Sequence, residues 1–330
     1  MDCHGRYSNG SLGAIHAPRD GAVIIDLTLA HLSDLHVTPI RVRRLGELAN
    51  KRALGWLSWR RRRRHEHRAE ILDALLDDLA TAAPDHVAIT GDLTNVGLPE
   101  EIEAAVAWLE RMGGPGRVSL VPGNHDAYAA AVERERFAAW LPYLQAPDGA
   151  GAAARAAEGE LRFPWVKRVG GLALVGLSSA VPTLPGLASG ALGAAQLARL
   201  DETLAALARE RVGRVILVHH PPVPAGQSRR RQLSDAAELR AVLARHGADL
   251  VIHGHTHRTS LEHVAGPDGP IPVVGVPSSS ARGSKPGRRA SYHLYRFATG
   301  ESGAGLRITC AVRALEPDRL RFSPAGEHAL

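Results

Sequence analysis

Residues 23–36 have the sequence VIIDLTLAHLSDLH, in which an apolar, β-branched run leads directly into polar side chains that commonly bind metals. The run Val23–Leu29 predicts a buried strand. Asp34 and His36 follow it and are two residues apart, so on an extended segment they point the same way. This spacing suits two ligands of one ion. The stretch therefore predicts a strand whose carboxyl end carries part of a metal site.

The same pattern returns after other predicted strands, which are Val87–Thr90, Val118–Val121, Val215–Val218 and Leu250–Ile252. The side chains that follow these strands are, in order, Asp92, then Asn124, His125 and Asp126, then His219, then His255 and His257. In an open α/β sheet, ligands bind beyond the carboxyl ends of the strands, so these segments can converge on one point. A mixture of imidazole, carboxylate and amide oxygen suits Mn, Fe or Zn better than Ca or Mg.

Amphipathic helices are predicted between these strands, over residues 71–79, 102–109, 197–207 and 239–243. The alternation of strands and helices predicts an α/β fold with helices on the sheet faces. More strand candidates follow, which are Trp165–Val169, Leu172–Leu177, Val273–Val276, Tyr292–Phe297 and Leu306–Val312. They predict a second, mixed sheet packed on the first.

From Asp34 to His257 the motifs D-x-H, G-D, G-N-H-D, H and G-H-x-H occur in the order found in calcineurin-like metallophosphoesterases, a family that this sequence resembles. The resemblance implies a four-layer αββα sandwich with two mixed sheets and a bimetal site at the strand ends. The metal ligands that it implies are Asp34, His36 and His257 for one ion, Asn124, His219 and His255 for the other, and Asp92 as the bridge.

The resemblance also implies a reaction, in which a hydroxide bridging the two ions attacks phosphorus in line with the leaving oxygen. His125 would stabilise the developing charge or protonate the leaving group, and Asp126 would orient His125. His220 would support the ligands by hydrogen bonding. The sequences I-T-G-D-L-T around Asp92 and H-H-P-P from His219 are similar to the branch that holds bacterial cyclic-nucleotide phosphodiesterases. We therefore expect a hydrolase of phosphodiesters, with a cyclic nucleotide as the leading substrate.

The bulk composition predicts a soluble cytoplasmic protein. The chain has 330 residues, 45% of them hydrophobic and 22% charged, and two cysteines near opposite ends, which implies no disulfide framework. We expect a flexible leader over residues 1–20, one domain over 21–315 and an irregular tail over 316–330. Among the remaining histidines, His31 and His253 are predicted either to pack in the fold or to support the site. His65 and His67 are predicted to be solvated and His86 to lie in a surface loop.

The segment 41–68 is a basic insert between the first two motifs. It holds eleven Lys or Arg and two Glu, and it contains Trp56 and Trp59 followed by Arg60–Arg64. One interpretation is a solvated charged helix start. Another is a peripheral contact with an anionic membrane surface, which would suit a membrane-surface pyrophosphatase or phosphodiesterase acting on a lipid-linked substrate such as a UDP-acyl sugar.

Two further interpretations carry less support in the sequence. Nucleic acid is an unlikely partner, because the few aromatic residues offer little surface for base stacking. A non-catalytic metal-binding scaffold is the last alternative, although every expected ligand type is present. The sequence predicts no oligomeric state.

Overall fold

The computed structural model describes residues 24–37, 39–40, 42, 45–48, 51–128, 137–144, 162–224, 226–300 and 305–330. The predicted leader over residues 1–20 lies outside the described residues. So does the Ala/Gly-rich segment 148–158.

The first sheet combines a parallel half with an antiparallel half. Its strand order is β12 (Phe322–Ala329), β11 (Leu306–Leu315), β10 (Ser291–Thr299), β1 (Asp26–Leu32), β2 (His86–Ile89) and β3 (Val118–Leu120). Strands β1, β2 and β3 are parallel, whereas β1, β10, β11 and β12 pair antiparallel. The carboxyl ends of β1, β2 and β3 therefore lie at the same edge.

The second sheet has the order β4 (Trp165–Val169), β5 (Leu172–Gly176), β6 (Gly213–Val218), β7 (Leu250–His253), β9 (Gly269–Gly275) and β8 (Ser260–Gly266). Strands β5, β6, β7 and β9 are parallel, and the edge strands β4 and β8 are antiparallel to their neighbours. Both sheets are mixed, as predicted. The expected division of the strands between the sheets is wrong, because β6 and β7 belong to the second sheet and β10 and β11 to the first.

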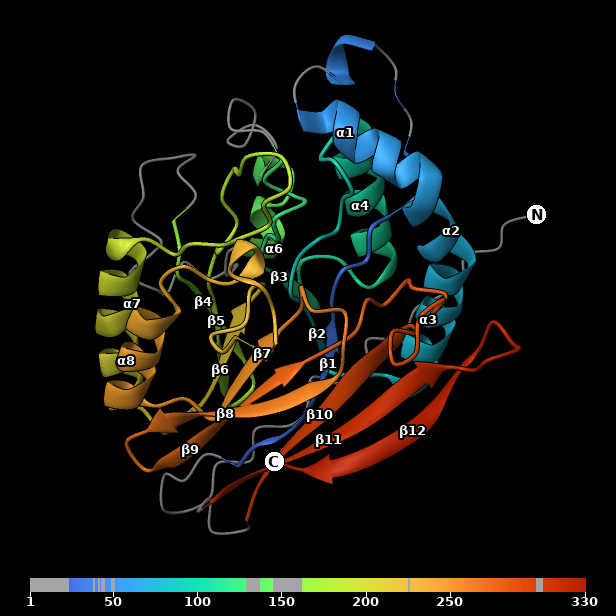
Figure 1. The fold of residues 1–330 in the computed structure, drawn as a ribbon. Helices are drawn as coiled ribbons and strands as arrows, with labels where there is room; N and C mark the ends of the chain where they lie inside the picture. Colours follow the sequence, from blue (N-terminus) through green and yellow to red (C-terminus); the bar gives the residue numbers. More distant parts are fainter. Residues whose placement is uncertain are drawn as a thin grey trace, which may run out of the picture.

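The two sheets pack face to face and helices cover their outer faces (Figure 1). Along β6, Val215 and Leu217 belong to the core shared with the first sheet, whereas Ile216 and Val218 pack in the cluster that includes α7 (Ala194–Leu207) and α8 (Ala236–His246). This alternation follows from the two-residue period of a strand, and burial on both faces explains the continuous apolar run. Helices α3 (Ala69–Ala82) and α4 (Pro99–Arg111) cover the other sheet. The predicted four-layer sandwich is confirmed.

The prediction of an irregular tail over residues 316–330 is wrong. Strand β12 pairs with β11 from Leu315 opposite Phe322 to Thr309 opposite Ala329. Apart from Phe322, its residues are exposed or half-buried, so an alternating apolar pattern is missing from the sequence. Backbone pairing with β11, rather than side-chain burial, forms this edge strand.

The basic insert forms a helical segment made of α1 (Lys51–Ser58), the π-helical turn η2 (Trp59–Arg63) and α2 (Arg64–Glu66). Trp59 is buried in a small cluster with Ile40, Val96 and Leu98. Trp56 is half-buried, and the Arg60 guanidinium lies 5.4 Å from its ring centroid. The Trp59 ring therefore packs on protein. In the described part of the chain, every helix is too short or too polar to cross a membrane.

Candidate metal centre

Five loops meet where the carboxyl ends of β1, β2, β3, β6 and β7 come together. Hydrogen bonds tie these loops to one another across the two sheets. The Asp34 N–H donates to Gly91 O at 2.9 Å, and the Gly254 N–H donates to His219 O at 3.2 Å. The Nδ1 of His219 lies 2.6 Å from Thr90 O. Segments more than a hundred residues apart therefore form one connected rim.

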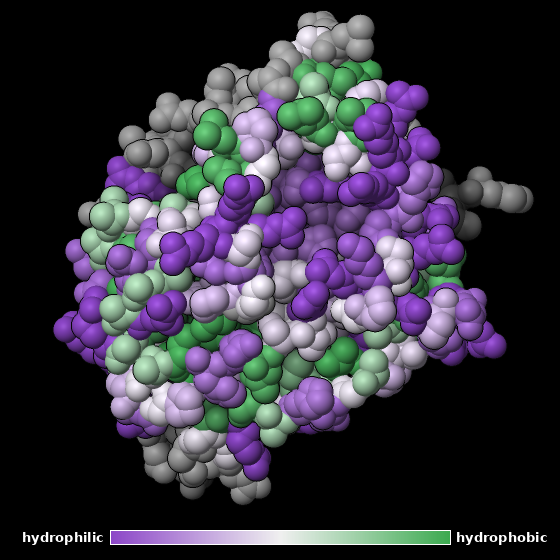
Figure 2. Space-filling model, in the orientation of Figure 1, coloured by the Kyte–Doolittle hydropathy of each residue, from purple (hydrophilic) through white to green (hydrophobic). Residues whose placement is uncertain are grey.

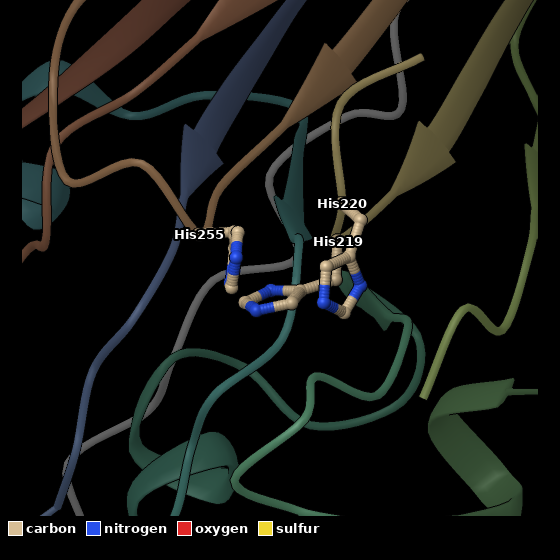
Figure 3. A group of neighbouring side chains, drawn as sticks. All are labelled: His219, His220 and His255. Atoms are coloured by element: carbon tan, nitrogen blue, oxygen red, sulfur yellow. The ribbon is translucent and has the colours of Figure 1, made fainter. Parts of the chain in front are cut away.

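The ligand-type side chains gather into three overlapping groups, each with its ligand atoms within 4.8 Å of one another. The groups are Asp34 with His36 and His257, Asp34 with Asp92 and His219, and His219 with His220 and His255. Figure 3 shows the last group, with its three imidazoles close together. Asn124 adjoins the same cluster, because its Oδ1 lies 3.3 Å from His219 Nε2. All seven side chains predicted as metal ligands thus lie together.

The backbone at this centre is strained. Five non-glycine residues there adopt left-handed φ angles between 43° and 65°. They are Asp34, His36, Asp92, His255 and His257. Elsewhere in the described chain, only Ala83 at a helix end shares this conformation among non-glycine residues. Each costs about 1–3 kcal/mol, and such strain persists where surrounding structure enforces it, typically at functional sites.

The contacts of the buried Asp34 carboxylate indicate whether a cation fits this centre. The side chain is fully buried, and its Oδ2 accepts a hydrogen bond from the His255 N–H at 3.0 Å. Its Oδ1 accepts no hydrogen bond, yet it lies 3.0 Å from His257 Nε2. A buried, unsatisfied carboxylate oxygen is costly. A cation held by both atoms would remove that cost, so the residues fit a metal ion.

The protonation of the imidazoles agrees with a ligand role. Burial lowers the pKa of His36 to about 4 and that of His255 well below its usual value, so both offer lone pairs at neutral pH. Burial also lowers the pKa of His219, but the carboxylates of Asp92 and Asp34 outweigh it and raise the value to about 9. A metal ion in place of that proton would experience the same attraction.

Asp92 lies between the two sides of the centre. Its Oδ1 accepts a hydrogen bond from the His125 N–H at 2.7 Å, and its Oδ2 lies 3.4 Å from His219 Nε2. Burial raises the pKa of Asp92, but the charges of His219 and His125 outweigh burial and hold that pKa well below its usual range. An ionised carboxylate in this place suits a ligand shared by two cations.

The prediction that Asp126 orients His125 is wrong. The Nδ1 of the His125 ring lies 2.5 Å from the carbonyl oxygen of Asn95. The Asp126 carboxylate instead accepts the N–H groups of Gly123 and Thr94, each at 2.9 Å. Burial, reinforced by the nearby charge of Asp92, raises the pKa of Asp126 to about 7. Asp126 therefore joins two loops of the centre.

His220 supports its surroundings through both ring nitrogens. Nδ1 lies 2.8 Å from Ser179 Oγ, and Nε2 lies 3.1 Å from Ala188 O. Its ring centroid is 4.2 Å from that of His255. His220 thus connects a predicted ligand to the chain around residue 180.

Two side chains at the centre, both from the basic insert, were not predicted from the sequence. His67, predicted to be solvated, is buried with its ring centroid 4.4 Å from that of His36 and its Nδ1 2.8 Å from Ser280 Oγ. Arg63 Nη1 lies 3.0 Å from His125 Nδ1. The four-residue spacing of Arg63 and His67, which puts both on one face of a helix, was a usable signal.

Of the other histidines, His86 also departs from its prediction. It lies in β2 and is buried, with Nε2 2.8 Å from Ser119 Oγ, so it is not a surface residue. His65 is exposed, as expected. His31 and His253 are buried near the centre, and His31 Nε2 lies 2.9 Å from Thr90 Oγ1.

Residues 27–259, more than half of the chain, match the model of the family described as calcineurin-like phosphoesterase. One similar curated protein, from a Synechococcus strain, is named probable cyclic nucleotide phosphodiesterase. It is 26% identical over 192 residues, which cover 57% of this chain and 64% of that protein. A protein of the same name from Rhodococcus erythropolis is 30% identical over 196 residues, which cover 58% of this chain and 56% of that protein. The chain therefore spans less than two thirds of the length of either relative.

Solved structures share the fold at low identity. A dimetal phosphatase from Danio rerio superposes with a TM-score of 0.51 at 14% identity, over 90% of this chain and 98% of that chain. A purple acid phosphatase from yellow lupin seeds superposes with a TM-score of 0.53 at 13% identity, over 88% of this chain and 52% of that chain. At these identities the likeness shows a common architecture.

Proposed function

This chain belongs to the calcineurin-like phosphoesterase family, and from that premise we propose that it hydrolyses a phosphodiester with the help of two metal ions. The overlap of the ligand groups carries this proposal. Asp34 and His219 each belong to two groups, and Asp92 joins both in the central one. A site for one ion needs a single group, whereas overlapping groups suit two neighbouring ions.

The ligand division that we propose is the one that the family resemblance implies. One ion would be held by Asp34, His36 and His257, the other by Asn124, His219 and His255, and Asp92 would be shared. When bound, two such ions supply Lewis-acid activation of water and neutralise the charge of the phosphoryl oxygens. The imidazoles and carboxylates favour Mn, Fe or Zn.

His125 would act at the substrate rather than on the metals. Because the Asn95 carbonyl can only accept, the contact with Nδ1 at 2.5 Å places a proton on Nδ1 and leaves Nε2 as the reactive nitrogen. A ring held in this way would exchange a proton with the leaving oxygen at Nε2. Asp126 would act indirectly, by fixing the loop that carries His125.

A cyclic nucleotide is the substrate class that we propose first, because both curated relatives carry names of that activity. A second candidate is a lipid-linked diphosphate ester, such as a UDP-acyl sugar, met at an anionic membrane surface. The observation in its favour is that the Arg-rich insert reaches the centre through Arg63, while Leu54 on the same insert leaves 60% of its surface exposed.

Side-by-side hydrolysis by the Mn-loaded protein tests these proposals. One assay contains a cyclic nucleotide, the other a UDP-acyl sugar in detergent micelles, and Asp92→Ala is the control for both. Faster turnover of the cyclic nucleotide supports the first candidate, and faster turnover in micelles supports the second. A protein that binds two ions per chain yet hydrolyses neither would favour the non-catalytic scaffold.

A further inference from the structure

Among the described residues, the Arg63 guanidinium contacts no carboxylate. The residue is half-buried. A guanidinium has five N–H donors, and its burial without a partner is costly. Burial lowers the pKa of Arg63, although the charge of Asp92 opposes this effect. An anion close to the Arg63 guanidinium would offset the cost of burying its charge.

The contact between Arg63 and His125 leaves donor capacity unused. His125 Nδ1 lies 3.0 Å from Arg63 Nη1 and 2.5 Å from the Asn95 carbonyl oxygen. One ring nitrogen cannot donate to the carbonyl and accept from the guanidinium at the same time. The shorter contact favours donation to Asn95, so the N–H groups of Arg63 remain available to a ligand beside the metal centre.

The insert holds Arg63 firmly in this place. Before it, Lys51 Nζ donates to Thr183 O at 2.9 Å and to Thr183 Oγ1 at 2.8 Å, and Trp59 is buried. After it, the Glu66 carboxylate accepts the Gly283 N–H at 3.0 Å, and Glu66 O accepts the Arg282 N–H at 2.7 Å. Arg63 itself ends a single π-helical turn, a feature often found at functional sites. Such anchoring prepares a side chain for binding.

Other arginines extend the positive charge around the centre. The Nε2 of His255 lies 2.9 Å from the carbonyl of Arg231. Burial lowers the pKa of Arg63 and of Arg288, and the charge of Arg231 lowers both further. Figure 2 shows this face hollowed and hydrophilic below the apolar tip of the insert. A negatively charged ligand in the hollow would relieve the mutual repulsion of these side chains.

We propose that Arg63 is a substrate-binding residue that donates to a phosphoryl oxygen of the substrate, so that this one side chain of the basic insert belongs to the active site. This inference rests on the proposed hydrolase function and adds a group outside the predicted metal ligands. The oxygen belongs either to the scissile phosphate or to a second phosphate. Two substrates distinguish these sources: bis(4-nitrophenyl) phosphate, which has one phosphate, and UDP-glucose, which has two.

The experiment compares Arg63→Met with Arg61→Met, a matched control on the same π-helical turn whose side chain is exposed. KM and kcat are measured on both substrates with Mn-loaded protein. Calorimetry measures the binding of inorganic phosphate, which needs no turnover. Bound metal and melting temperature are checked in each variant. If Arg63→Met loses fold or metal, Arg63→Gln carries the same comparison.

We expect Arg63→Met to raise KM about 10- to 100-fold with a smaller change in kcat, and to weaken phosphate binding similarly, as befits a lost charge-assisted hydrogen bond. Arg61→Met should match the wild type. A rise in KM on both substrates identifies the scissile phosphate, and a rise on UDP-glucose alone identifies the second.

Equal KM and equal phosphate affinity in the two variants would overturn the inference. If the wild type hydrolysed neither ester while Arg63→Met still weakened phosphate binding, the hydrolase proposal would fail and the anion site at Arg63 would stand.

Discussion

Gly91→Ala is expected to destabilise the protein and disrupt the metal centre, because Gly91 meets two constraints at once. Its φ is +92°, and an added Cβ would lie 2.6 Å from Gly123 N and 2.9 Å from His219 Nδ1. The backbone strain costs about 1–3 kcal/mol, and the overpacking adds about 1–3 kcal/mol. Relief of the clash would move Gly123, whose N–H binds Asp126, and His219, a proposed ligand.

Gly186→Ala is the matched control, since Gly186 has a φ of +82° and no atom within 4 Å of an added Cβ. Both variants share the backbone strain and the lost entropy of the unfolded chain. Their difference in free energy of unfolding therefore isolates the steric contribution, about 1–3 kcal/mol. Urea unfolding of the metal-free proteins measures it, and metal analysis measures the bound Mn. If Gly91→Ala proved as stable as Gly186→Ala and kept its metal, the account of close packing around the centre would be refuted.

Three other outcomes test separate parts of the account. Asp92→Ala should lose both ions and all activity, because it removes the ligand that we propose the two ions share; elemental analysis and hydrolysis assays check this, and retained activity would contradict the assignment. His125→Ala should keep its metal and lose about a hundredfold or more in kcat, as for a positioned acid or base, and an unchanged kcat would exclude that role. Burial, aided by the charges of Lys167 and Arg117, lowers the pKa of His86 from 6.5 to about 3. Between pH 6.5 and about 3, His86 is therefore protonated in the unfolded chain but neutral in the folded one. Its contribution makes the free energy of unfolding fall by about 1.4 kcal/mol for each pH unit as the pH drops through this range. His86→Gln should show a shallower pH dependence of urea unfolding, and an identical slope would argue against a buried neutral His86.

The sequence by itself determined the strands that build the centre and the ligand types at their ends. The β-branched run Val215–Val218 predicts a strand. It is apolar throughout because both faces of the second sheet are covered, so every side chain of the strand is buried. Asp34 and His36 follow β1 directly, so their place at the sheet edge depends only on neighbours a few residues away. The order of the motifs then predicted which segments would meet, and the layered fold brought them together.

Only the tertiary structure decided which side chains are buried and which distant groups they bond to. His67 lies in a strongly basic stretch, yet it is buried because Ser280, 213 residues away, contacts its ring. Asp126 is adjacent to His125, but its carboxylate accepts a hydrogen bond from the N–H of Thr94, 32 residues away. The His125 ring is oriented by the Asn95 carbonyl instead. Strand β12 forms through backbone hydrogen bonds to β11. Such pairing requires no alternating apolar residues, so the sequence does not reveal it. Periodicity and motifs report local conformation, whereas burial and hydrogen-bond partners depend on segments that only the folded chain brings together.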